Sequence, residues 1–130
     1  MVFVDLLTQV LHMLFAGLWT GSVLFVALAG VPEGGIDRLQ QITRASAVVL
    51  LVTGGHMAGT AYTAGSLTGT TSGWLVLVML GLWLVLAGLV EVAAKRYESD
   101  GPAAARPLLQ AGGVVAALLL VDAGLLAAGI

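Results

Sequence analysis

Long apolar runs alternate with short polar segments along this chain, and the runs take up most of its length. Each run is close to or above the roughly 20 residues that cross a bilayer as an α-helix. The pattern therefore predicts an all-α, integral membrane four-helix bundle, with residues 1–130 forming a single domain. The predicted helices cover about residues 4–31, 40–66, 74–96 and 107–130.

Three polar segments separate the predicted helices: PEGGID at 32–37, SLTGTTSG at 66–73 and YESDGPAAARP at 97–107. The proline and glycine residues in these segments favour turns. Pro107 suits the first turn of the last helix, because a proline there loses no helical hydrogen bond. We therefore expect the third segment to be the longest connection.

Basic residues are distributed unevenly over these segments. Arg38 and Arg44 flank the first segment, and Lys95, Arg96 and Arg106 flank the third, whereas the middle segment carries no charge. By the positive-inside rule, the first and third segments are cytoplasmic. Both termini are then predicted to lie on the outer side of the membrane.

Composition supports a membrane protein and excludes several other classes. Hydrophobic residues make up 59% of the chain and charged residues 9%, whereas soluble domains carry about a quarter charged residues. The formal net charge is −2, there is no basic patch for nucleic acid, and there is no cysteine for a disulfide or a thiolate metal site. We expect a multi-pass protein of the cell membrane, surrounded by the lipid bilayer.

Small residues recur at four-residue spacing inside the predicted helices, which lets helix backbones approach closely in lipid. Gly17 and Gly21 form one such pair, and Gly55 and Gly59 form another. The last helix carries a longer row, and we expect all of these positions to be helix contacts. That row consists of Gly112, Ala116, Leu120 and Gly124.

Four polar groups lie inside the apolar runs, and three of them are predicted to share one layer. At about 1.5 Å of rise per residue, His12 and Asp122 lie roughly 12 Å below the outer surface and His56 roughly 15 Å below it. A lone carboxylate is costly in hydrocarbon, so Asp122 is expected to face the interior of the helix bundle and to hydrogen-bond to a histidine. The fourth group, Glu91, precedes Lys95 by four residues, which predicts a helical ion pair.

Two histidines at matching depth predict a bound b-type heme. Neutral imidazole is a common axial ligand of haem iron, so His12 and His56 are the predicted axial pair. A flat macrocycle needs space between helices, which glycines beside His56 supply. The other predicted cofactor-binding residues share a helix face with one of the histidines or lie beside one, and they are Trp19, Gly55, Gly59 and Thr60.

Two alternatives to haem remain open. The first is copper, because methionine thioethers suit Cu(I) and Met13, Met57 and Met79 fall in the same outer half as His12 and His56. The second is a purely structural role, in which the histidines hydrogen-bond across helices and the protein is an accessory subunit of a membrane complex.

The stretch LHMLFAGLWTGSVLF resembles the first helix of the copper-resistance protein D (CopD) membrane domain, with a histidine followed by small residues and Trp-x-Gly. The run from VVLLVTGGHMAG through LTGTTSGWLVLVML resembles the second helix, polar turn and next helix of that domain. HemJ-type protoporphyrinogen oxidases, which are associated with b-type heme, have a similar first helix. The resemblance carries over His12, Trp19, Gly21, Thr53 and Gly54, and it implies a metal- or haem-linked membrane role.

The sequence thus predicts a CopD-like membrane protein that binds haem for electron transfer or sensing. An electron carrier needs no catalytic residue, and the chain has neither a Ser-His-Asp order nor an HExxH motif. A redox partner, a membrane-complex partner and a second copy of the chain are the partners compatible with this prediction.

Overall fold

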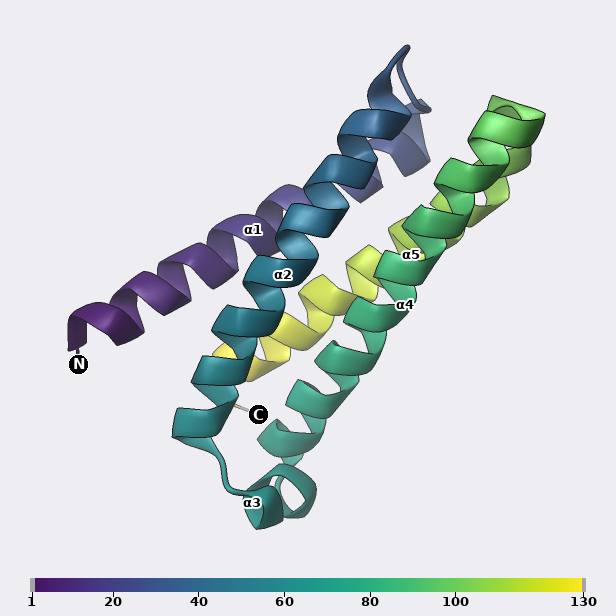
Figure 1. The fold of residues 1–130 in the computed structure, drawn as a ribbon. Coiled ribbons are helices and arrows are strands. Elements are labelled where there is room, and N and C mark those ends of the chain that lie inside the picture. Colours follow the sequence, from purple (N-terminus) through teal and green to yellow (C-terminus); the bar gives the residue numbers. More distant parts are fainter. Residues whose placement is uncertain (1, 130) are drawn as a thin grey trace.

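A computed structural model describes residues 2–129, and every regular element in that range is helical (Figure 1). The helices are α1 (Val2–Ala29), α2 (Gly35–Ala61), α3 (Ala64–Gly69), α4 (Thr71–Asp100) and α5 (Pro102–Ala127).

The four long helices lie lengthwise against one another, and α3 is a single short helix at one end (Figure 1). The helices α4 and α5 share the most extensive contact, and α1 packs against both α5 and α2. The helix α2 also meets α4, but more sparsely. The four long helices therefore follow one another around a common interior in the order α1, α2, α4, α5.

Among the described residues, three helices are long and apolar enough to cross a membrane: α1, α4 and α5. The sequence predicted four such helices. The helix α2 falls outside the set, although it is 27 residues long, and its first part explains why. That part contains Asp37, Arg38, two glutamines and Arg44, so its apolar portion is confined to the second half of the helix.

Helix boundaries differ from the prediction at two connections. The second helix ends at Ala61, because Tyr62 and Thr63 are extended and Thr63 caps α3 with a reciprocal pair of hydrogen bonds to Ser66. The predicted polar turn is therefore partly helical.

The third connection is much shorter than predicted. The helix α4 continues to Asp100 and α5 begins at Pro102, so Gly101 alone joins them. Its φ of 88° lies in the region that glycine adopts readily. Pro102 occupies the first position of α5, and Pro107 lies inside the helix instead of in its first turn.

The core forms between the four long helices, around the fully buried Trp19, Val23 and Leu86. Glycines of α5 allow this close approach. A Cβ on Gly112 would lie 3.3 Å from Val23 Cγ1, and one on Gly113 would lie 2.7 Å from Ala27 Cβ. The predicted contact row on the last helix is thus confirmed at Gly112 and at the buried Ala116.

The other small-residue contacts are not formed. A Cβ on Gly17, Gly21, Gly55 or Gly59 would meet no neighbouring atom within 4 Å, and the same holds for Gly124. Leu120, the remaining member of the predicted row, is exposed. Four-residue spacing identified residues that allow close packing, but not the helix faces that are packed.

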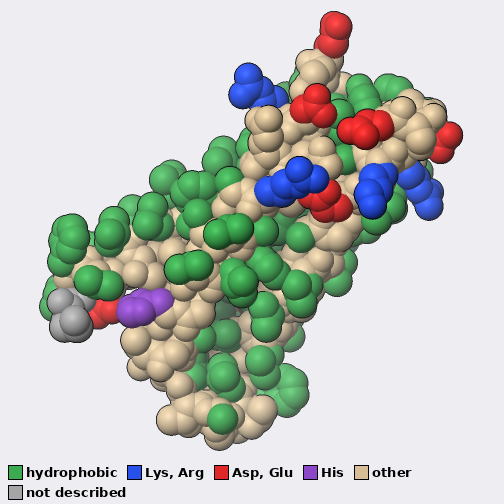
Figure 2. Space-filling view, in the orientation of Figure 1, with side chains coloured by type: hydrophobic (Ala, Val, Ile, Leu, Met, Phe, Trp, Pro, Cys, Tyr) green, Lys and Arg blue, Asp and Glu red, His purple; other side chains and the backbone are tan. Residues whose placement is uncertain are grey.

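Charged side chains gather at one end of the molecule, where Figure 2 shows the lysine and arginine side chains together. At that end Arg44 Nε lies 3.0 Å from Glu91 Oε1, and Gln40 donates a hydrogen bond to the same carboxylate. The predicted Glu91–Lys95 pair is absent from the ion pairs of the described residues. Glu91 instead joins α4 to α2.

Candidate functional site

Polar side chains of α1 spaced seven residues apart each bond to a side chain of α2. Seven residues are close to two helical turns, so these side chains share one face of α1. The three pairs, which we call the α1–α2 polar pairs, are Asp5–His56, His12–Thr53 and Trp19–Thr43.

The middle pair fixes the orientation of His12. The Thr53 hydroxyl donates to the carbonyl of Val49 at 2.7 Å, so its oxygen is left to accept from His12 Nδ1 at 2.8 Å. Because the Thr53 hydroxyl has a single proton, this network assigns the imidazole proton to Nδ1. His12 Nε2 therefore keeps its lone pair for another partner.

Gly54 allows the His12 ring to lie against the backbone of α2. A Cβ at this position would be 3.2 Å from His12 Cε1, which is closer than most such contacts. The sequence analysis expected glycines beside His56 to make space on this helix. The glycine that lies against a histidine ring is Gly54, and that ring belongs to His12.

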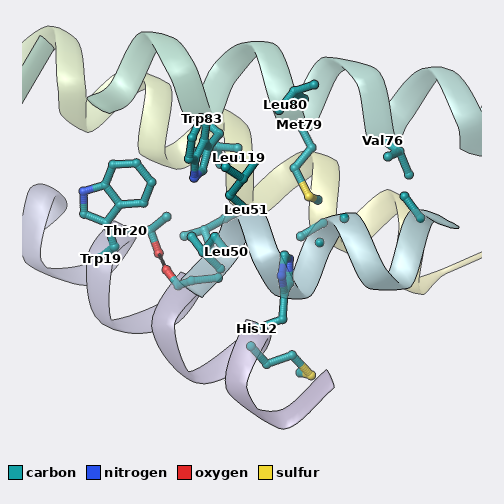
Figure 3. A pocket seen from close by; sticks show the side chains of 17 residues that line it. His12, Trp19, Thr20, Leu50, Leu51, Val76, Met79, Leu80, Trp83 and Leu119 are labelled. Carbon is teal, nitrogen blue, oxygen red and sulfur yellow. Dashed lines mark hydrogen bonds between the residues drawn. The ribbon is translucent and has the colours of Figure 1, made fainter. Parts of the chain in front are cut away.

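His12 lines a cavity of about 320 Å³, and residues from all four long helices contribute to its lining. The lining is almost entirely apolar and includes Trp19 from α1 and Trp83 from α4. Figure 3 shows the thioether of Met79 directed toward the imidazole of His12. Met13 also lines the cavity. The imidazole of His12 and the thioether of Met79 thus lie in one apolar cavity.

The chain matches no family model, no curated protein and no solved structure. The geometry of the cavity and the sequence therefore carry the functional argument.

His56 occupies a different place from His12. Its Nε2 lies 3.3 Å from Asp5 Oδ1, both side chains are largely exposed, and neither residue lines the cavity. The earlier end of α2 explains the difference, because the helix stops five residues before the predicted Ser66. At 1.5 Å per residue, this brings His56 about 7.5 Å closer to the helix end. The structure does not bring the predicted axial pair together.

Of the other predicted site residues, some line the cavity and others do not. Trp19 and Gly55 line the cavity, whereas Gly59, Thr60 and Met57 do not. The Thr60 hydroxyl donates to the Met57 carbonyl on its own helix. Within residues 2–129, no three His, Cys, Asp or Glu side chains form a group able to hold a metal ion.

Asp122 is buried, as predicted, with only 4% of its surface exposed. Its predicted hydrogen bond to a histidine is not formed among the described residues, where the imidazoles of His12 and His56 bond only to Thr53 and Asp5. Asp122 Oδ2 has no hydrogen-bond partner among the described atoms. Asp122 is adjacent in sequence to Ala123, which lines the cavity.

Sequence reasoning missed Trp83 and Thr43. Trp83 lines the cavity, and its buried Nε1 has no partner among the described atoms. Thr43 accepts the Trp19 Nε1 hydrogen at 3.0 Å. No spacing pattern marked either residue, since a tryptophan in an apolar run and a threonine near a helix start are both common in membrane helices.

Proposed function

We propose that the chain is a multi-pass protein of the cell membrane in which α2 is a fourth spanning helix. Its contacts with α1 and α4 and its 27-residue length support this, since about 20 residues suffice to cross a bilayer. The grouping of lysine and arginine at one end of the molecule supports a cytoplasmic position for that end. Both termini then lie on the outer side.

Within this arrangement, the cavity would bind a b-type heme, which His12 and Met79 would hold. The observation that carries this proposal is the free Nε2 of His12 in an apolar cavity, with the Met79 thioether directed toward it. Histidine and methionine form a known axial pair. Met79 thus takes the place first assigned to His56, and the resemblance to CopD and HemJ proteins favours the same class of role.

The protein's own residues would hold and orient such a group. Thr53 fixes the His12 ring, Gly54 leaves room for it, and Trp19 and Trp83 line the space beside it. Haem supplies one-electron transfer when bound. The role is therefore electron transfer near the outer face, or haem-based sensing.

A visible absorption spectrum of protein purified from a haem-replete host tests this function. We expect a Soret band that is lost in His12→Ala, and a changed spectrum in Met79→Leu because one axial ligand is replaced. His56→Ala and Met57→Leu are matched controls that keep the band, since neither residue lines the cavity. Colourless wild-type protein, or loss of the band in His56→Ala alone, would contradict the proposal.

Copper is the second candidate, and the Met79 thioether favours it. His12 and Met79 both line the cavity, and an imidazole together with a thioether suits Cu(I), whereas Met13 is 65% exposed. If copper is the ligand, the purified protein should be colourless and should retain about one copper per chain through dialysis. Met79→Leu would release the copper, and Met57→Leu would retain it. A colourless protein that retains no copper would exclude both candidates.

A further inference from the structure

The cavity around His12 is bordered by side chains that are exposed on the outside of the protein. Leu51 on α2 is 56% exposed and Leu80 on α4 is 46% exposed, and both line the cavity. Gly55, one turn after Leu51, is also exposed and also lines it. We refer to Leu51, Gly55 and Leu80 as the α2–α4 opening.

The contact between α2 and α4 is sparse enough to leave such an opening. These helices share the least contact of any two long helices that meet. They are connected at one end through α3 (Figure 1). Moreover, a Cβ on Gly55 would meet no atom within 4 Å, so no side chain covers the cavity at that position.

The α2–α4 opening is apolar on both its outer and its inner side, which favours the entry of apolar molecules. In a bilayer, Leu51 and Leu80 face hydrocarbon, and the cavity behind them has an almost entirely apolar lining. Apolar cavities stay dry but accept apolar molecules. Hydrocarbon on both sides of the opening favours a solute that already dissolves in lipid.

We propose that the cavity is open sideways to the bilayer through the α2–α4 opening and that phospholipid acyl chains enter it when no other ligand is bound. This inference goes beyond the proposed function, and it rests on the cavity alone. It can therefore hold even if haem does not bind.

Tryptophan fluorescence offers a direct test on cofactor-free protein. The chain has three tryptophans, and Trp19 and Trp83 both line the cavity. A Trp74→Phe background leaves these two as the only emitters. Reconstitution into phosphatidylcholine vesicles with brominated acyl chains reports lipid contact, because bromine quenches indole fluorescence at short range.

Two substitutions place a side chain in the cavity, Gly55→Leu and Ala58→Leu, since both residues line it. Gly59→Leu is the matched control, because Gly59 lies one turn after Gly55 with equally open surroundings but does not line the cavity. We expect strong quenching in the parent and in Gly59→Leu, and loss of most of it in Gly55→Leu and Ala58→Leu. Circular dichroism and elution volume confirm that each variant is folded.

Two results would overturn the proposal. One is quenching in both folded cavity variants that equals the quenching of the parent. The other is weak quenching of the parent itself, which would mean that acyl chains do not reach the cavity. Absence of a Soret band would contradict the haem function but would leave this inference intact.

Discussion

At the residue scale, a single hydroxyl determines what His12 can bind. Thr53 accepts the Nδ1 hydrogen because its own proton is donated to Val49. The imidazole is thereby fixed in one tautomer and one orientation, with Nε2 free. Partners of this kind hold ligating histidines in place in many metal sites.

Thr53→Val should therefore weaken haem binding without removing the ligand itself. Loss of a residue that orients a metal ligand typically costs roughly 10- to 100-fold in affinity, and we expect a loss in that range. Titration with hemin, followed by Soret absorbance, measures it. Thr53→Ser should restore binding because it keeps the hydroxyl, and Thr60→Val should have no effect. An unchanged affinity in Thr53→Val would show that Thr53 does not position the ring.

At the residue scale, part of the candidate site could be predicted from the sequence and part could not. His12 and the glycine-rich stretch around His56 were identified from their polarity and spacing. The partner of His12 was not, because the depth of His56 depended on where α2 ends. That end is determined by the extended Tyr62 and by the cap at Thr63, which hydropathy does not report.

At the element scale, the crossing of α1 and α5 depends on glycines that have no room for a side chain. Gly113 is the tightest of them, since its Cβ would lie 2.7 Å from Ala27 Cβ. Van der Waals contact between carbon atoms is optimal at about 3.5–4.0 Å. The two helices must therefore move apart to accept even alanine.

Gly113→Ala should destabilise the protein by about 1–3 kcal/mol, the usual cost of overpacking. Gly88→Ala on α4 is the control, because a Cβ there meets nothing within 4 Å. Alanine is the better helix former by about 1 kcal/mol, so the control should be neutral or stabilising. Unfolding in mixed detergent micelles compares the two, and equal stabilities would contradict the close contact at Gly113.

Helix existence was predictable from apolar runs, whereas the packed faces were not. Every predicted apolar run contains a long helix, but the glycine pairs of α1 and α2 have no neighbouring side chain. A helix in lipid can present small residues to hydrocarbon as easily as to another helix. The sequence predicted the contact at Gly112, but only the arrangement of the long helices shows the tighter contact at Gly113.

At the scale of the whole molecule, the number of membrane crossings determines which side of the membrane each connection faces. The helices α1, α4 and α5 meet the length and hydropathy expected of a span, and α2 does not. If α2 crosses, the segments before and after it lie on opposite sides of the membrane. If it does not cross, they lie on the same side.

Cysteine labelling decides between these arrangements, and the chain has no native cysteine to interfere. Glu33→Cys, just before α2, and Thr68→Cys, in α3, replace exposed residues on either side of α2. With four spans, a membrane-impermeant maleimide should label position 68 in intact cells and position 33 only after lysis. Labelling of both positions under the same condition would contradict a spanning α2.

The one-residue connection at Gly101 bears on how the protein enters its membrane. Because α4 and α5 are joined so closely and share the largest helix contact, they form a helical hairpin. Contacts that are local in sequence form with the smallest loss of chain entropy. We expect this hairpin to insert as a unit after α1 and α2 have left the ribosome. The interior around His12 would then close only when the two halves of the chain associate, which makes its formation a late step of biogenesis.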